Sequence, residues 1–149
     1  MQMNDSQRIP ASKEKVWAAL NNPDILKQCI PGCQSLEMGA PNEMTATVVL
    51  KVGPVKATFG GKVTLSDLDP PNGYKISGQG DGGVAGFAKG GATVKLTPKN
   101  GGTLLAYNVD AQIGGKLAQL GQRLVNGAAK KIADDFFANF ANAVNPKPA

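Results

Sequence analysis

Two cysteines are the first residues of this chain that could do chemistry, because they lie close together around a turn. Cys29 and Cys33 flank Ile30-Pro31-Gly32, and the chain contains no histidine. Their spacing differs from the C-x-x-C pattern of redox and zinc sites, and no histidine is present to complete a metal site. We therefore predict no metal site and two reduced thiols in a turn. The functional alternative is that this turn borders the mouth of a pocket.

The acidic residues offer no pair suited to general acid–base catalysis. Asp134 and Asp135 are adjacent on a predicted helix, so their side chains diverge, and Asp67 and Asp69 lie at a turn. Without histidine, a serine or cysteine nucleophile lacks its usual base. An enzyme on this scaffold would have to use Asp, Glu, Lys or Tyr, and Tyr107 is the inward-facing candidate that we name. We predict no catalytic residue and a protein that is not an enzyme.

A glycine-rich segment at 78–83 matches the G-x-G-x-x-G pattern of dinucleotide-binding sites. That pattern requires a helix directly after the glycines and an acid about 20 residues further on. Here a strand pattern follows, and no Asp or Glu occurs between Gly82 and Val109. We predict a glycine-rich connection between strands instead. Its continuation, 84–91, is either an apolar lid over a pocket or a tightly packed, bulged hairpin.

The elements that must position these residues follow from two hydrophobic periods. Ser12 and Asn22-Pro23 are typical starts of two short helices, at 13–20 and from 23 to about Gln28. Period-two alternation follows and predicts antiparallel strands with one wet face, joined by short turns. The inward set includes Met44, Ala46, Val48, Leu50, Val52, Val55, Ala57, Phe59, Val63, Leu65, Tyr74, Ile76, Ala92, Val94, Leu96, Leu105, Tyr107, Val109, Ala111 and Ile113.

The last third of the chain, from Gly114 to Val144, has a helical period and predicts one long amphipathic helix. Its apolar stripe consists of Leu117, Leu120, Leu124, Ala128, Ile132, Phe136 and Phe140. Gly121 and Gly127 fall inside this helix at a cost of about 1 kcal/mol each relative to alanine. Either the sheet backbone approaches closely there, or a ligand occupies the space. A long helix laid across a curved sheet leaves a groove between them, which favours binding of an apolar molecule.

Composition limits the possible partners. The chain has 149 residues, a formal net charge of +5 and no apolar stretch long enough to span a membrane, and its polar start lacks a signal region. We therefore expect one domain at 1–144, a Pro-containing tail or linker at 145–149, and a cytoplasmic location. The lysines are dispersed along the strands, which excludes nucleic-acid binding. They indicate either a solvated surface or weak attraction toward an acidic partner or anionic lipid head groups.

Six segments of the chain carry a family resemblance: Lys15-Val16-Trp17, Asn22-Pro23, Cys29-Ile30-Pro31-Gly32-Cys33, Lys51-Val52-Gly53-Pro54-Val55, Asp69-Pro70-Pro71 and Gly114-Gly115-Lys116-Leu117-Ala118-Gln119-Leu120-Gly121. Together they resemble the carbon monoxide dehydrogenase CoxG family of the START-like (SRPBCC), helix-grip superfamily. The resemblance runs from about Ala11 to Val144. This resemblance implies an α+β fold, in which a curved antiparallel sheet of about seven strands wraps around a long C-terminal helix. It also implies a first strand near 3–9, two short helices after it, and a second strand that begins at 36–38.

The same resemblance implies a function. The protein would be a non-enzymatic accessory of a molybdenum hydroxylase of the carbon monoxide dehydrogenase type. It would lie peripherally at the inner face of the cytoplasmic membrane and hold a lipophilic ligand, a quinone such as menaquinone or ubiquinone, with no covalent cofactor. The alternative is a recruitment or assembly factor that acts by protein contacts alone; a cyclase-like or hydrolase-like enzyme on this fold is the third hypothesis. We predict a pocket lined by Ile30, Val84, Phe87, Tyr107, Leu117, Leu120 and Leu124, with Tyr107 as its polar group.

Overall fold

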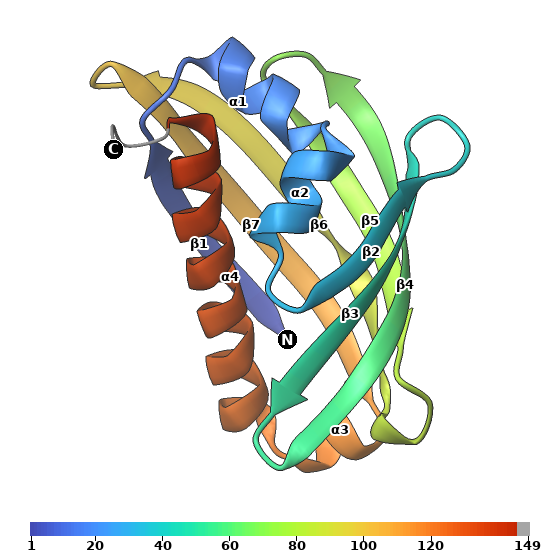
Figure 1. Ribbon diagram of the computed structural model, residues 1–149. Helices are drawn as coiled ribbons and strands as arrows, with labels where there is room; N and C mark the ends of the chain where they lie inside the picture. Colours follow the sequence, from blue (N-terminus) through green and yellow to red (C-terminus); the bar gives the residue numbers. More distant parts are fainter. Residues whose placement is uncertain (146–149) are drawn as a thin grey trace.

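A seven-stranded sheet curls partly around one long helix in the computed structural model, which describes residues 1–145 (Figure 1). In chain order the elements are β1 (Gln2–Ile9), α1 (Lys13–Leu20), α2 (Pro23–Cys29), β2 (Cys33–Met38), β3 (Glu43–Val52), β4 (Val55–Asp69), β5 (Gly73–Asp81), the single 3-10 turn η1 (Gly83–Ala85), β6 (Phe87–Lys99), β7 (Gly102–Gly114), α3 (Lys116–Gln119) and α4 (Gln122–Val144). The helix-grip fold, with its early strand and two short helices, is confirmed.

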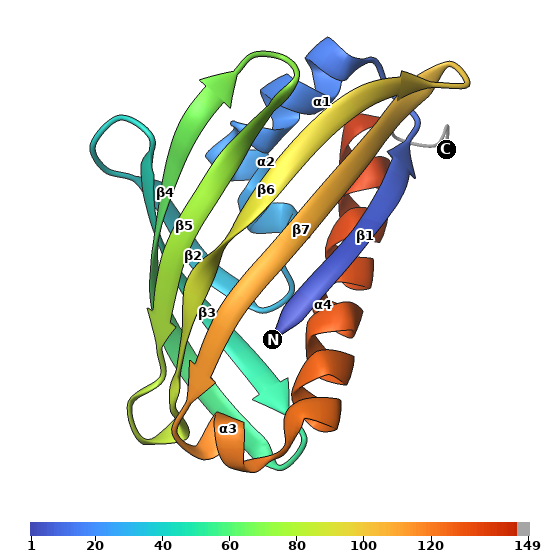
Figure 2. The ribbon, with the colours of Figure 1, turned by 180° about the vertical axis from the view of Figure 1, so that it is seen from behind.

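The strands lie in the order β1-β7-β6-β5-β4-β3-β2, and every neighbouring pair is antiparallel (Figure 2). Alternate residues therefore face the two sides of the sheet. The predicted apolar set lies on the concave side, toward α4, and the lysines and threonines between them lie on the convex side. The period-two pattern thus predicted correctly which face of each strand is apolar.

Two capped helices close one end of the sheet. The Ser12 hydroxyl accepts a hydrogen bond from the Lys15 amide at 3.3 Å, and Asn22 Oδ1 accepts one from the Asp24 amide at 3.0 Å. These bonds satisfy amides that have no partner inside their helices. Both helices pack against the C-terminal half of α4, so the main hydrophobic core lies at this end.

The main core is anchored by side chains from α1, α2, α4 and six strands. Its fully buried members include Ile9, Val16, Leu96, Leu105 and Phe140. A second, smaller cluster of buried residues lies toward the other end, formed by Val52, Phe59, Ala85 and Leu117. The middle of the molecule, between the two clusters, is therefore the least packed part of the interior.

The prediction of one helix from Gly114 to Val144 is wrong at its N-terminal end. The chain forms the single turn α3, then Leu120, and α4 begins only after Gly121. Gly121 has a φ of 91°, which belongs to the left-handed region where glycine lacks the steric penalty of other residues. Gly121 is thus the residue that reorients the chain between two helices, rather than a glycine tolerated inside one.

The connection between β5 and β6 is also shorter than the glycine-rich segment that was predicted to form it. Gly78 and Gly80 lie in β5, Gly90 and Gly91 lie in β6, and only residues 82–86 link the two strands. The Asp81 carboxylate accepts a hydrogen bond from the Gly83 amide at 2.7 Å and stabilises the start of η1. Of the two alternatives for 84–91, the structure has a hairpin, but the register of β5 and β6 is regular and lacks the predicted bulge.

No helix among residues 1–145 is long and apolar enough to cross a membrane. The Pro-containing tail predicted at 145–149 falls, from residue 146 onward, outside the described residues.

Candidate functional site

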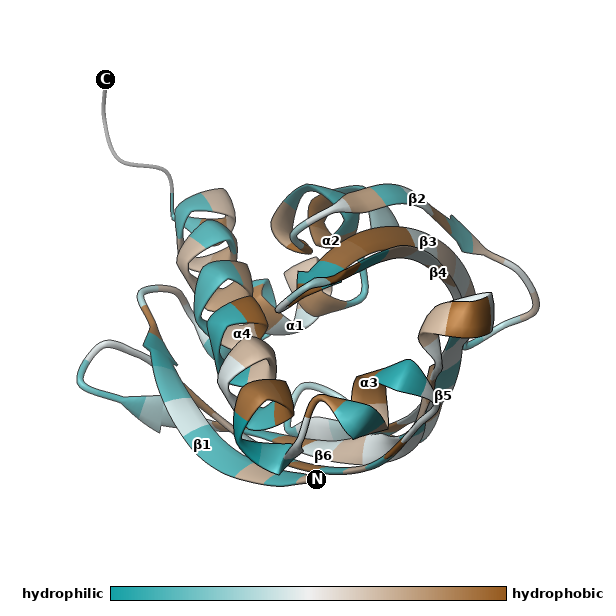
Figure 3. Cartoon of the chain, turned by 90° about the horizontal axis from the view of Figure 1, so that it is seen from below, coloured by the Kyte–Doolittle hydropathy of each residue, from teal (hydrophilic) through white to brown (hydrophobic). Residues whose placement is uncertain are grey.

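A length difference between two neighbouring strands opens the candidate site. β2 pairs with β3 only from Met44 to Val48, so the last residues of β3, through Val52, have no strand on that side. The Val49 amide donates to the Gly32 carbonyl at 2.9 Å, and this bond marks where pairing stops. Helix α4 lies opposite this free edge, across the open side of the curved sheet (Figure 3).

Between α4 and the free edge of β3 lies a groove with a volume of about 820 Å³. Its apolar side chains come from the α2–β2 turn, β3 and both helices at the C-terminus: Pro31, Val49, Leu50, Leu120, Leu124, Ala128 and Ile132. Gly32, Gly53 and Gly127 contribute backbone, and Lys51, Arg123, Lys131 and Asp135 contribute charge. A groove of this size and lining can accommodate the apolar part of a small molecule.

The first half of α4 is only partly covered by protein. The only buried residues of α4 are Phe140 and Val144, both in its last turns, whereas Leu124 remains 41% exposed. Ala128 and Ile132 are half-buried on the groove side, and Ala128 packs against the smaller cluster. Since apolar side chains on one helix face usually bury against a partner, this half of the stripe is incompletely buried within the chain.

The concave side of the sheet is also incompletely packed at mid-height. Its inward residues there are small or half-buried: Ala46, Val48, Val63, Ile76, Ala92, Val109 and Ala111. In contrast, Leu65, Tyr74, Val94, Leu96, Leu105 and Tyr107 are buried on the same face nearer the main core. Solvent therefore reaches the middle of the concave face, where a side chain of ordinary core size would exclude it.

Two lining residues are in contact at one end of the groove. A Cβ placed on Gly53 would lie only 2.7 Å from Leu124 Cδ2, so the β3–β4 turn and the start of α4 touch. Gly127, by contrast, has no atom within 4 Å of such a Cβ. Close approach of the sheet is therefore wrong for Gly127, and the ligand-space alternative stays a prediction.

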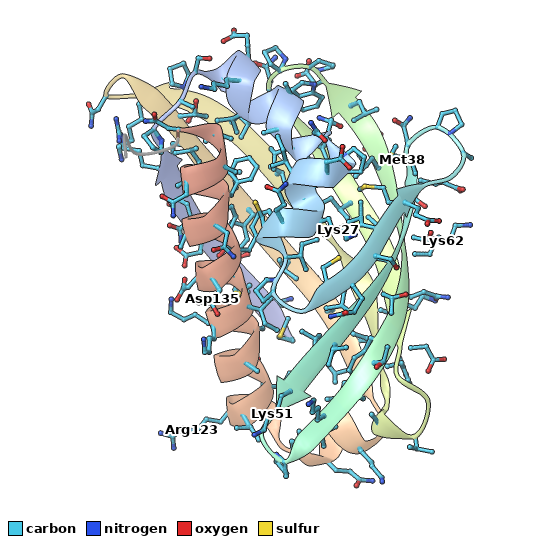
Figure 4. All side chains as sticks on the ribbon, in the orientation of Figure 1. Lys27, Met38, Lys51, Lys62, Arg123 and Asp135 are labelled. Carbon is cyan, nitrogen blue, oxygen red and sulfur yellow. The ribbon has the colours of Figure 1, made fainter. Side chains whose placement is uncertain are left out.

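The charges at the groove differ in whether they have partners. Lys131 Nζ lies 2.8 Å from Asp135 Oδ2 in an exposed i,i+4 ion pair. Lys51 and Arg123 form no ion pair among the described residues, and they lie near the start of α4 (Figure 4). Their N–H groups are the hydrogen-bond donors available at the rim to a polar head group.

The structure places four of the seven predicted pocket residues at or near this groove. Leu120 and Leu124 line it. Ile30 directly precedes the lining residue Pro31, and its side chain packs on the main core. Leu117 is buried in the smaller cluster, against which Leu120 also packs.

The other three predicted residues lie elsewhere. Val84 is 85% exposed at the tip of η1, and Phe87 is 46% exposed on the convex side of the sheet. Tyr107 is buried on the concave side and stacks on Phe137 with ring centroids 5.3 Å apart. Burial raises the pKa of Tyr107, and the nearby Asp5 and Asp134 carboxylates raise it further. Its hydroxyl thus lies between β1 and the face of α4 that carries Asp134, and Tyr107 does not line the groove.

Several groove residues were absent from the predicted set. Ala128 and Ile132 belong to the predicted apolar stripe of the helix, so the helical period already indicated them. Lys51 and Arg123 carry no such signal, because they lie 72 positions apart in the sequence and only the fold brings them to one rim.

The two cysteines are free thiols with different environments. Cys29 is 1% exposed, and burial raises the pKa of its thiol. Cys33 is half-buried, and its Sγ lies 3.3 Å from the Ser35 carbonyl oxygen. Neither arrangement makes a metal or redox centre, and within residues 1–145 no three His, Cys, Asp or Glu side chains gather where they could bind a metal ion.

The difference in burial between Cys29 and Cys33 predicts that a thiol reagent modifies one of them selectively. In native protein at mildly alkaline pH, a thiol reagent should modify Cys33 while Cys29 stays protonated and covered, because the thiolate is the reactive form. Mass spectrometry of the modified protein would identify the site, and Cys33→Ser should remove the native-state reaction. Modification of both cysteines at equal rates before unfolding would contradict this placement.

A curved antiparallel sheet that grips a C-terminal helix, with an apolar groove between them, defines a helix-grip domain. The sequence narrows the class: the family model for CoxG, a subunit of carbon monoxide dehydrogenase, matches residues 6–145. The chain therefore belongs to the CoxG family, as the sequence motifs predicted.

Solved structures agree with this assignment. A conserved protein from Geobacillus kaustophilus is 34% identical, with a TM-score of 0.91 over 97% of this chain and 95% of that one. A protein from Chromobacterium violaceum (18% identity, TM-score 0.72, 98% and 99% coverage) and Ara h 8.0201 (18%, 0.70, 99% and 99%) share the fold. Among curated proteins, none matches the sequence.

Proposed function

We propose that this protein holds a lipophilic molecule in the groove between α4 and β3, and that this molecule is a respiratory quinone, menaquinone or ubiquinone. The observation that carries the proposal is the apolar groove of about 820 Å³ beside the half of α4 that has no fully buried residue. Small-molecule sites are typically ~300–1,000 Å³, mostly apolar, with few polar groups. This groove has those properties.

The lining fits an amphiphile of that kind better than a polar metabolite. Leu50, Leu124 and Ile132 would contact an isoprenoid tail, and burial of such a chain is favourable by ~25 cal/mol per Å² of apolar surface. Lys51 and Arg123 would donate hydrogen bonds to carbonyl oxygens of a quinone head at the rim. Such a task requires binding and shielding rather than bond making, which suits a groove without a catalytic pair.

Membership of the CoxG family supports a role beside a molybdenum hydroxylase of the carbon monoxide dehydrogenase type. In this proposal the protein is not itself an enzyme. It works at the inner face of the cytoplasmic membrane, takes quinone from the bilayer and presents the head group to that dehydrogenase.

Lipid extraction tests the proposal most directly. Protein purified without harsh detergent should release a quinone that mass spectrometry identifies, and quinone added in mild detergent should bind at about one equivalent. If no lipid is released and no quinone binds, while the dehydrogenase is still captured by the protein, the groove has no carrier role. The protein would then be the recruitment or assembly factor that acts by protein contacts alone.

A further inference from the structure

The end of the molecule next to the groove has an unusual combination of charge and exposed apolar side chains. It is built by three segments, 50–58, 80–89 and 112–124, which we call the basic end. These segments are far apart in sequence, yet Val52, Ala85 and Leu117 from them pack into one buried cluster. The turn at Gly53 touches Leu124, and a Cβ on Gly86 would lie 3.3 Å from the Leu117 amide.

The basic end carries most of the net charge of the chain. It contains five of the sixteen Lys and Arg residues but only one of the eleven Asp and Glu residues. The cations are Lys51, Lys56, Lys89, Lys116 and Arg123, and all five side chains belong to exposed residues. The single acid, Asp81, already accepts a hydrogen bond from the Gly83 amide at 2.7 Å. The remainder of the chain is close to neutral by the same count.

The same end exposes aliphatic side chains. Val84 is 85% exposed at the tip of η1, the highest value among the exposed large apolar residues, and Leu124 is 41% exposed. The β3–β4 turn, η1 and α3 all lie together at this end, with the start of α4 beside them (Figures 1 and 2). An isolated protruding valine among lysines offers little area for a protein interface, but it suits insertion into the apolar layer below lipid head groups.

We propose that the basic end docks on the surface of a bilayer that contains anionic phospholipid. Lys56 and Lys116 would contact head groups, and Val84 would enter the interface. Lys51, Arg123 and Leu124 belong both to the basic end and to the groove rim, so docking places the groove mouth at the membrane surface. This inference rests on the proposed function, which gives docking its purpose. A lipophilic molecule could pass from the bilayer to the groove with little exposure to water.

Vesicle binding tests the inference separately from ligand binding. The protein should co-sediment with phosphatidylcholine vesicles that contain phosphatidylglycerol, bind vesicles of phosphatidylcholine alone much more weakly, and dissociate at high salt. The double variant Lys56→Glu/Lys116→Glu should weaken vesicle binding by on the order of 30-fold or more, since each cation near such a surface contributes to affinity. Val84→Asp should weaken it too, at the low salt concentration where the unmodified protein binds.

The matched control is Lys95→Glu/Lys99→Glu, which makes the same charge change on exposed lysines of β6 toward the opposite end. It should bind vesicles far better than the Lys56→Glu/Lys116→Glu variant. Equal loss of vesicle binding in both double variants would overturn the inference. No vesicle binding by the unmodified protein would overturn it too, and would indicate an acidic protein as the partner of the basic end.

A second readout separates the two proposals. Neither Lys56 nor Lys116 lines the groove, so the variant should keep its affinity for quinone in detergent. Retained quinone binding with lost vesicle binding supports the docking surface. Vesicle binding by a protein that binds no quinone would leave the docking surface standing and remove the proposed function.

Discussion

Replacing Phe140 by alanine should lower the free energy of unfolding by about 3–5 kcal/mol, the range observed for aromatic residues removed from packed cores. Phe140 is 0% exposed and stacks on Phe136 with ring centroids 5.7 Å apart. It lies in the part of α4 that contacts α1, α2 and the main core. Since the first half of the helix has no fully buried residue, this side chain is a principal anchor that holds α4 across the sheet.

Urea unfolding followed by circular dichroism would measure the change as a lower midpoint at an unchanged denaturant slope. The control is Leu124→Ala on the same helix, where the side chain is 41% exposed and the expected loss is about 1 kcal/mol or less. Equal losses at both positions would mean that α4 is held along its whole length, which would contradict the uncovered groove.

The strand alternation and the helix caps were enough to predict α1, α2 and the strands from β3 to β7 with their apolar faces, whereas β1 and β2 were expected only from the family resemblance. The alternation of β6 also indicated that Phe87 faces outward, and the predicted site did not take this into account. Ala92, Val94 and Leu96 face inward, so counting back by twos places Ala88 inward and Phe87 outward, as the structure has it. Val84 follows neither period, because it belongs to a 3-10 turn rather than to a strand. The prediction that it lines a pocket is therefore wrong, and its side chain forms an exposed tip.

Two properties of the site depend on the fold alone. Hydropathy predicts which side of a strand faces inward, but it does not predict whether the inward side chains of the sheet contact those of α4. Ala46, Ala92 and Ala111 face the concave side, yet they remain only half-buried. Likewise, lysines dispersed in the sequence gather at one end only after β3, η1 and α3 come together.

The groove itself is tested by filling it. Ala128→Trp should raise the Kd for quinone by roughly tenfold or more, a loss of about 1.4 kcal/mol or more. Ala128 is half-buried on α4, lines the groove and packs beside the smaller cluster. An indole at this position would project into the space opposite Leu50, where the apolar part of the ligand is proposed to lie.

Ala138→Trp is the matched control, because Ala138 lies on the same helix, is exposed and does not line the groove. Both variants add the same side chain, so comparison of quinone titrations in detergent removes any general effect of tryptophan on the assay. Ala128→Trp should also unfold at no lower urea concentration than the parent protein, because the indole enters open space rather than a packed core. If Ala128→Trp binds quinone as tightly as Ala138→Trp does, the ligand does not lie between α4 and β3. The uncovered half of the helix would then need a different occupant.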